Sequence, residues 1–398
     1  MTKNGIFVLM QFNEVIGQQK VAQKLRESVS NNRIAHAQFF AGTNGSGNLP
    51  LAFSYAQFVL CQNRQEEACG ECRSCKMVRN LSHPDVHFAF PVANTGNGKS
   101  KASSKDFINE WREMMLSNPY SELEDWINHL DVQNKQLNIG VNESEAIVRQ
   151  LSLKSYEGGH KVLILWHPEK LNVQAANKLL KLIEEPVGET LILFVGPSVE
   201  DVLATIVSRT QIIRLSPIDE QDIAQYLMEK LNSPHDEAQN ISHLTEGNLS
   251  KAIRWYNHQG GENIFSELFI EWMRLCFKAL KVKDLDQLAT WNQEMAGLGR
   301  ERLKSFFTFC TQVIRKALLN NYASGNLSAL ELKAPGFDMA KFSPYVHADN
   351  CMTIIQELTL AARHIERNAN AKIVMMDTSF KIARQLHHKL NVDSYYGV

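Results

Sequence analysis

The sequence AHAQFFAGTNGSGNLPLAFSYAQFVL, residues 35–60, decides the fold of the first half of the chain. It predicts a short strand, a glycine-rich turn and a helix, which is the order of a phosphate-binding loop with the pattern G-x-x-x-x-G-K-[ST]. Glycine stands where that pattern requires or tolerates it, at Gly42, Gly45 and Gly47. Asn48 and Leu49, however, occupy the positions of the lysine and the hydroxyl residue. We therefore expect a turn kept for its backbone shape, with at most weak phosphate binding through its N–H groups.

Four apolar runs after this turn predict the rest of a sheet. DVHFAF, KVLILW, TLILFVG and IIRL are short and apolar, and helical patterns such as NVQAANKLLKLIEEP lie between them. This alternation is typical of a parallel α/β sheet. After Pro217 the pattern is helical, and GGEN at 260–263 resembles a linker. Since 398 residues are too many for one ordinary core, we predict three domains: α/β over 1–216, a small helical domain over 217–259 and an all-α domain over 262–398.

One stretch interrupts the α/β pattern, and we interpret residues 92–137 as an insertion on the edge of the sheet. It begins with the polar sequence NTGNGKSKASSKD and continues with helical patches such as FINEWREMML. Gly98, Lys99 and Ser100 supply the residues that the first turn lacks. The first glycine of the pattern is replaced by Ala93, and the surroundings have low complexity, which favours a solvated linker over a second phosphate loop.

Four of the seven cysteines lie within fifteen residues, at Cys61, Cys69, Cys72 and Cys75. The spacing C-x7-C-x2-C-x2-C suits a structural zinc ion, because C-x2-C turns present two sulfurs to one metal. A redox pair and a chance set of reduced thiols are the alternatives. Four protein ligands close the coordination shell, so a zinc ion here would leave no position for a catalytic water. Cys276, Cys310 and Cys351 stand among apolar residues and are expected in the core.

Bulk properties exclude several classes of protein. The formal net charge is −1, which gives no global basic field for nucleic acid. No apolar run is long enough to span a membrane. GIFVLM near the start is too short for a signal peptide and has no cleavage pattern. A cytoplasmic protein with thiols or metal ligands instead of disulfides is the expectation.

An ordered series of motifs resembles a known family. The series runs FNEVIGQQKVAQKL, NRIAHAQFFAGTNGSG, the four cysteines, SHPDV, AANKLLKLIEEP and IVSRT. It resembles the bacterial clamp-loader ATPase family, the AAA+ subunits of DNA polymerase III, and within it the delta-prime type, which keeps the fold without working ATPase chemistry. The resemblance is close over roughly 10–90 and 139–255 and weaker in the C-terminal helices. It implies an AAA+ α/β domain with an inserted zinc module at 61–75, a helical lid and an oligomerising all-α collar.

The resemblance also implies that three ATP-handling positions are lost. Asn48 brings no charge to the phosphates, and Leu49 has no oxygen for magnesium. Trp166 and His167 stand where the family has an acidic pair. Ser250, with Lys251 adjacent, stands where it has a phosphate-sensing arginine. We expect no functional ATP or Mg²⁺ site and no enzyme activity in the chain itself.

One charged motif remains at Ser208-Arg209-Thr210, where family members have Ser-Arg-Cys. The resemblance implies that Arg209 acts in trans as an arginine finger in a neighbouring subunit's ATP site. The alternative is an exposed arginine with a surface partner. Glu184 and Glu185, before Pro186, are interpreted as the end of a helix and not as an acid–base pair.

The implied function is that of a non-catalytic subunit of the replicative clamp loader within the DNA polymerase III holoenzyme. Implied partners are gamma/tau and delta in a hetero-oligomeric ring, and the sliding clamp and primed DNA through that ring. We expect the apolar helix FSELFIEWMRLCFKAL, residues 265–280, to contribute to assembly. The alternatives are an active gamma/tau-type ATPase and a zinc-bearing DNA-binding protein that works alone.

Overall fold

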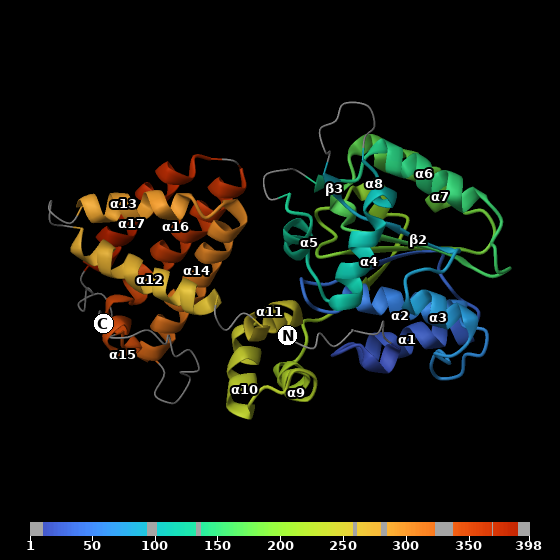
Figure 1. Cartoon of the computed structure of the whole chain (residues 1–398), viewed down its shortest axis with the longest axis horizontal. Coiled ribbons are helices and arrows are strands. Elements are labelled where there is room, and N and C mark those ends of the chain that lie inside the picture. Colours follow the sequence, from blue (N-terminus) through green and yellow to red (C-terminus); the bar gives the residue numbers. More distant parts are fainter. Residues whose placement is uncertain are drawn as a thin grey trace, which may run out of the picture. The chain divides into compact units, whose positions relative to one another are not determined.

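The computed structural model describes residues 11–93, 102–132, 137–257, 261–279, 285–322, 337–367 and 369–388 (Figure 1). The chain divides into two compact units, residues 1–254 and 255–398, and each is described by itself. The Gly98-Lys99-Ser100 sequence lies outside the described residues. Within the described part, no helix is both long and apolar enough to cross a lipid bilayer.

The first unit is built on a five-stranded sheet whose order is β2-β5-β6-β1-β7. All neighbouring strands are parallel, which confirms the predicted α/β sheet. The strands are β1 (Ala37–Ala41), β2 (Val86–Ala89), β5 (Lys161–Trp166), β6 (Thr190–Gly196) and β7 (Gln211–Arg214). Each corresponds to one of the five apolar runs. The three central strands are buried along their whole length, because helices cover both faces of a parallel sheet.

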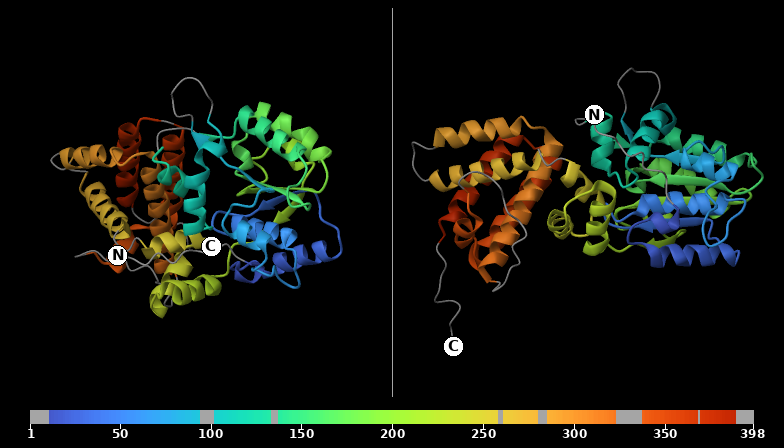
Figure 2. Two further views of the ribbon diagram at one scale, coloured as in Figure 1. Left: turned by 45° about the vertical axis from the view of Figure 1, so that its right-hand side comes forward. Right: turned by 60° about the horizontal axis from the view of Figure 1, so that its bottom comes forward.

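The helices form a layer on each face of the sheet (Figures 1 and 2). One layer packs its apolar side chains against Phe39 and Phe194 and contains α6 (Val141–Ser152), α7 (Val173–Glu184) and the short α8 (Ala204–Val207). Asn172 caps the start of helix α7, and its side chain accepts a hydrogen bond from the Ala175 N–H. The other layer contains α1 (Gln19–Ser30), α2 (Asn48–Leu60) and α3 (Arg73–Arg79). Short 3₁₀ turns lie at η1 (Phe12–Glu14) and η3 (Pro168–Lys170).

The insertion is a folded module. It is bounded by β3 (Val92–Ala93) and β4 (Leu137–Asn138), which pair antiparallel with Ala93 opposite Leu137. Between them lie η2 (Ser104–Phe107), α4 (Ile108–Ser117) and α5 (Leu123–His129). The helical patches predicted after the polar sequence are present as α4 and α5. Trp111 of α4 and Trp126 of α5 are fully buried, as their helical patterns favour, so the module packs into the unit.

Three helices follow the sheet and form what we call the three-helix segment: α9 (Glu220–Leu231), α10 (His235–Leu244) and α11 (Leu249–Asn257). Among the residues that the structure describes, no strand follows Pro217, as predicted. Gly247 joins α10 to α11 with a φ of +84°, and a Cβ there would lie 2.5 Å from Pro217 Cβ. Glycine is therefore required where this segment meets the end of the sheet.

The described part of the second unit is helical, as predicted. Its helices are α12 (Gly261–Lys278), α13 (Leu285–Ala296), α14 (Arg300–Tyr322), α15 (Met339–Phe342), η5 (Ser343–Tyr345), α16 (Ala348–Glu366) and α17 (Ala371–Leu386). Cys276, Cys310 and Cys351 are buried, which confirms them as core residues. The apolar face of residues 265–280 was expected to exceed what one domain buries. Phe269 and Trp272 of this stretch lie in the unit's own core, whereas Phe277 is 41% exposed, so a contribution of this stretch to assembly stays a prediction.

Candidate functional site

The glycine loop, residues 42–47, connects β1 to α2 at the carboxyl edge of the sheet, where ligands bind in open α/β folds. Gly45 and Gly47 have φ values of +71° and +88°, which side chains rarely adopt. A Cβ on Gly45 would lie 2.0 Å from Asn248 Oδ1, and one on Gly42 would lie 2.8 Å from Leu215 Cβ. The fold thus requires glycine at these positions, as predicted, because other segments approach the loop too closely for a side chain.

Asn48 and Leu49 are used within the fold. Asn48 Nδ2 donates to the carbonyl oxygens of Gly42 at 3.2 Å and Gly196 at 3.3 Å, which holds the loop against the next strand. Leu49 is 1% exposed and packs in the core. Neither side chain therefore points a charge or an oxygen ligand into solvent at the first turn of α2.

The end of strand β5 is closed by aromatic side chains. Trp166 is buried, and its ring centroid lies 4.9 Å from that of Trp111, which belongs to the insertion. Trp111 in turn stacks on Phe90 at 4.3 Å. His167 has a φ of +57°, and its Nδ1 lies 2.5 Å from Glu169 Oε1. The end of this strand thus holds an apolar cluster in place of the acidic pair that the resemblance implies for ATPases, and Glu169 contacts His167.

The space over the glycine loop is almost filled. The remaining cavity, lined by residues such as Asn48, Tyr120, Trp166 and Pro197, measures about 10 Å³, which is the room that one water molecule needs. A ligand pocket for a molecule of nucleotide size has a volume of roughly 300–1,000 Å³. Tyr120 comes from the insertion, and sequence reasoning missed it. A bulky tryptophan in place of a carboxylate was the signal that could have revealed a filled site.

Ser250 is buried at the start of α11, and its hydroxyl donates to Asp125 Oδ2 at 3.3 Å. Two cations follow it on this helix, Lys251 as the next residue and Arg254 four residues later. The contacts of Arg254 reach α5. Its guanidinium lies 2.9 Å from Glu122 Oε2 and 2.9 Å from Asp125 Oδ1. The first unit therefore has a partly buried polar network between α5 and α11 that the sequence did not indicate.

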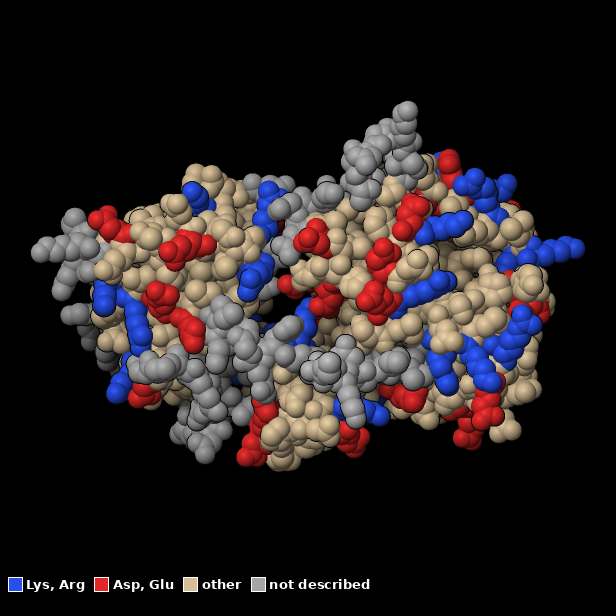
Figure 3. All heavy atoms as spheres, in the orientation of Figure 1, with Lys and Arg blue, Asp and Glu red and all other residues tan. Residues whose placement is uncertain are grey.

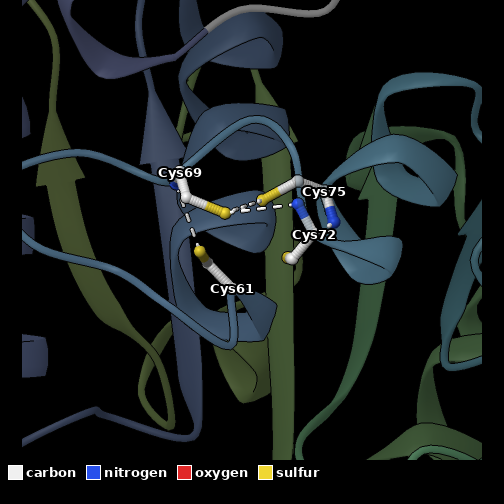
Figure 4. Close-up of side chains that lie close together, drawn as sticks. All are labelled: Cys61, Cys69, Cys72 and Cys75. Atoms are coloured by element: carbon white, nitrogen blue, oxygen red, sulfur yellow. Dashed lines mark hydrogen bonds between the residues drawn. The ribbon is translucent and has the colours of Figure 1, made fainter.

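The four clustered cysteines come together between α2 and α3. Figure 4 shows their side chains converging, and all four sulfurs lie within 4.8 Å of one another. Cys61 follows the last residue of α2, Cys72 caps the first turn of α3, and Cys75 lies within α3. Zn–S bonds of roughly 2.3 Å in a tetrahedron place sulfurs about 3.8 Å apart, and Cys69 Sγ lies 3.9 Å from Cys75 Sγ. The donor set and its spacing fit one zinc ion.

Backbone N–H groups support this cysteine cluster. Cys69 N–H donates to Cys61 Sγ at 3.2 Å, and Cys72 N–H donates to Cys69 Sγ at 3.3 Å. The N–H groups of Cys72 and Glu71 lower the pKa of Cys69 to about 6, while burial raises the pKa of Cys75. A cation would be needed to hold all four groups as thiolates in this partly buried space.

Arg209 lies between α8 and β7 and is partly exposed. Its Nε donates to a carboxylate oxygen of Glu184, the last residue of α7, and its Nη1 donates to the Thr205 carbonyl at 3.0 Å. The surface partner considered as an alternative is thus present. Both side chains of the pair remain open to solvent, at 37% and 47% exposure, so the guanidinium is accessible.

On the face shown in Figure 3, each of the two units carries both basic and acidic side chains. The described surface seen there has no broad field of one sign, in line with the near-neutral composition. Such a surface favours specific contacts over general attraction to nucleic acid.

Comparison with known proteins gives consistent matches. A family model described as "DNA polymerase III, delta subunit" matches residues 17–219. The DNA polymerase III subunit delta' of Bacillus subtilis is 26% identical over 236 residues, which are 59% of this chain and 58% of that relative. The subunit delta' of Escherichia coli is 23% identical over 314 residues, 78% of each chain. DNA polymerase III subunit tau of Bacillus subtilis is 25% identical over 219 residues, 55% of this chain and 31% of that relative. The match thus spans little more than half the length of the Bacillus delta' relative.

Proposed function

Because the chain belongs to the delta-prime family of DNA polymerase III subunits, we propose that it is a clamp-loader subunit for DNA replication without ATPase chemistry of its own. Its partners would be gamma/tau and delta subunits in a hetero-oligomeric ring, which loads a sliding clamp onto primed DNA. The observation that carries the non-catalytic role is the filled space over the glycine loop, where the remaining cavity is about 10 Å³.

Hydrolysis of ATP needs a cation on the β- and γ-phosphates and oxygen ligands for magnesium. Asn48 is neutral, and its amide is already bonded to two carbonyl groups of the fold. Leu49 lies in the core, and Trp166 fills the strand end where magnesium ligands would stand. Since each replacement removes a different contact, we infer that the chain neither binds ATP tightly nor hydrolyses it.

In this proposal Arg209 contributes to a neighbouring subunit's ATP site. A guanidinium is always charged, and its planar fork matches phosphate oxygens. In the isolated chain its partner is Glu184, and exposed pairs of this kind contribute only about 0–1 kcal/mol. Assembly could therefore exchange this carboxylate for a γ-phosphate at small cost, and the arginine would stabilise the charge that develops during phosphoryl transfer.

The cysteine cluster would hold a structural Zn²⁺ through Cys61, Cys69, Cys72 and Cys75. A closed shell of four thiolates adds folding free energy and has no open position for a substrate. Helix α2, with 13 residues and a length of about 20 Å, separates the cluster from the glycine loop. The metal would therefore stabilise the α2–α3 corner and take no part in phosphate chemistry.

Affinity capture of the full chain from the source cell extract tests this function. We expect the other clamp-loader subunits to be recovered with it, and their absence would overturn the assignment. Calorimetric titration of the isolated chain with Mg²⁺ and ATP separates it from an active gamma/tau-type ATPase, since tight binding would contradict the proposal. Salt-dependent binding to primed DNA by the chain alone would instead favour a separate DNA-binding role.

A further inference from the structure

The insertion is folded into the site, and from this we propose that it is a built-in substitute for a nucleotide. Its residues 119–125 fill the space over the glycine loop and connect the three-helix segment to the sheet domain. This inference rests on the proposed function. It explains how the three-helix segment is held against the sheet domain without ATP.

Tyr120 provides the filling. It is 2% exposed, and its hydroxyl accepts a hydrogen bond from the Ile16 N–H at 3.0 Å. Its ring lies against the glycine loop, because a Cβ added to Gly47 would be 3.4 Å from Tyr120 Cε1. The ring thus joins the segment before α1 to the start of α2 across the space where a ligand on the loop would lie.

Two carboxylates provide the connection. Glu122 precedes α5, and Asp125 lies in its first turn. In a capping box, the side chain of each residue accepts a hydrogen bond from the backbone N–H of the other. This cap fixes both carboxylates at the same end of α5. Arg254 of α11 bridges them with two contacts of 2.9 Å. Asn248 Nδ2 adds a hydrogen bond of 2.7 Å to Glu122 Oε1.

The position of Arg254 explains why these carboxylates can replace phosphates. A phosphate-sensing arginine would be expected at Ser250, and Arg254 follows it by four residues, about one helical turn along the same face. Lys251 is the residue next to Ser250, and Arg254 is the cation of α11 that binds Glu122 and Asp125 of the same chain. Both partners of this contact belong to the chain itself, so it forms without a ligand on the glycine loop.

Hydrogen exchange of the isolated full chain tests this inference. Arg254→Met removes the charge and keeps much of the side chain's length. We expect amides of α10 and α11 to exchange at least tenfold faster in this variant, with the amides of β1 and β6 unchanged. Lys230→Met is the matched control, because Lys230 is an exposed cation on α9 of the same segment, and its exchange should equal that of the unaltered chain. Equal exchange in Arg254→Met and the unaltered chain would overturn the proposal.

A second variant removes the whole insertion. Ala93 pairs with Leu137 across β3 and β4, so an Asn-Gly turn can join them in place of residues 94–136. We expect the shortened chain to keep its zinc content and lose protection in α9–α11; retained protection there contradicts the proposal. If the shortened chain does not fold, Arg254→Met alone decides.

These measurements use the chain without partners, so they separate this inference from the proposed function. Unchanged exchange would remove the insertion's role and leave the clamp-loader assignment intact. Failure to recover loader subunits would remove that assignment without altering the exchange rates.

Discussion

Arg209 lies against Glu184, so that the segment before β7 is tied to the last residue of α7. The two residues are 25 positions apart and meet at the surface of the first unit. The Glu184 carboxylate therefore binds the Arg209 guanidinium whenever no other anion does. Glu184 therefore competes with a neighbouring subunit's phosphate for Arg209 in the proposed role in trans. The same contact also holds the arginine in a fixed place.

Replacing Arg209 with alanine should leave folding and assembly intact, because an exposed pair contributes about 0–1 kcal/mol. An arginine finger raises the rate of its own site by roughly 10³–10⁵. The reconstituted loader should therefore lose the turnover of one site and keep that of others. Steady-state ATP hydrolysis and clamp loading on primed DNA measure this.

Glu184→Gln is the control for Arg209→Ala, since it removes the competing charge and keeps the arginine. Its ATP hydrolysis should equal or exceed that of the unaltered loader. Unchanged hydrolysis and loading in Arg209→Ala would make this arginine a surface residue only.

Replacing Cys72 with serine should abolish stoichiometric zinc and lower the melting temperature of the first unit, because three ligands do not close the shell. Elemental analysis of unchelated protein and calorimetric unfolding measure both effects. Cys351→Ser is the control: its sulfur is buried in the second unit, so one zinc per chain should remain. A freshly purified, unaltered chain with freely titrating thiols and no metal would rule out the site.

Gly45→Ala and Gly158→Ala form a matched pair for the contact between the glycine loop and the three-helix segment. Both glycines have positive φ, +71° and +80°, so both variants carry backbone strain of about 1 kcal/mol. Only Gly45 has a neighbour in the way, with Asn248 Oδ1 at 2.0 Å from the added Cβ, whereas Gly158 has nothing within 4 Å. Urea unfolding should show a clearly larger loss for Gly45→Ala. Equal losses would mean that Asn248 moves aside freely.

The first unit should lose stability as the pH falls from 7.5 to 5.5. Burial lowers the pKa values of His83, His87 and His160 below their ordinary value of 6.5. The unfolded chain then binds more protons than the folded chain in this range, so unfolding becomes easier as acid is added. The stabilising effect is present above the unfolded value and is lost as the pH approaches the lower folded values.

Urea unfolding of His87→Gln at both pH values isolates one of these groups. The loss between pH 7.5 and 5.5 should be smaller than in the unaltered chain, because one proton-binding difference is gone. His235→Gln is the control, as its side chain is 65% exposed, and its pH dependence should match the unaltered chain. The same slope in His87→Gln would show that His87 does not contribute to the acid sensitivity.

Local patterns were sufficient to predict the sheet, the glycine turn and the cysteine cluster. Five apolar runs became five parallel strands because each run is short, and each is bounded by turn residues. The spacing of Cys61, Cys69, Cys72 and Cys75 likewise brings four sulfurs together within one short stretch. These features depend on neighbours in sequence, which a single sequence displays directly.

The position of the insertion could not be predicted in this way. Trp111 and Trp166 are 55 positions apart, and periodicity shows that each is buried without showing that they touch. The Glu122–Arg254 contact joins residues separated by 132 positions. A capping box marks the start of α5 in the sequence, but its second use as an anchor for α11 depends on tertiary packing alone.

Helix α2 has no side that faces water: residues 49–59 are all buried. A helix of this kind cannot roll or slide without opening voids on several sides at once, and such voids are costly in a close-packed interior. The glycine loop and Cys61, which flank this helix, are therefore expected to move together as one rigid element. A displacement of Cys61, such as one caused by loss of a metal ion, should therefore shift the glycine loop as well.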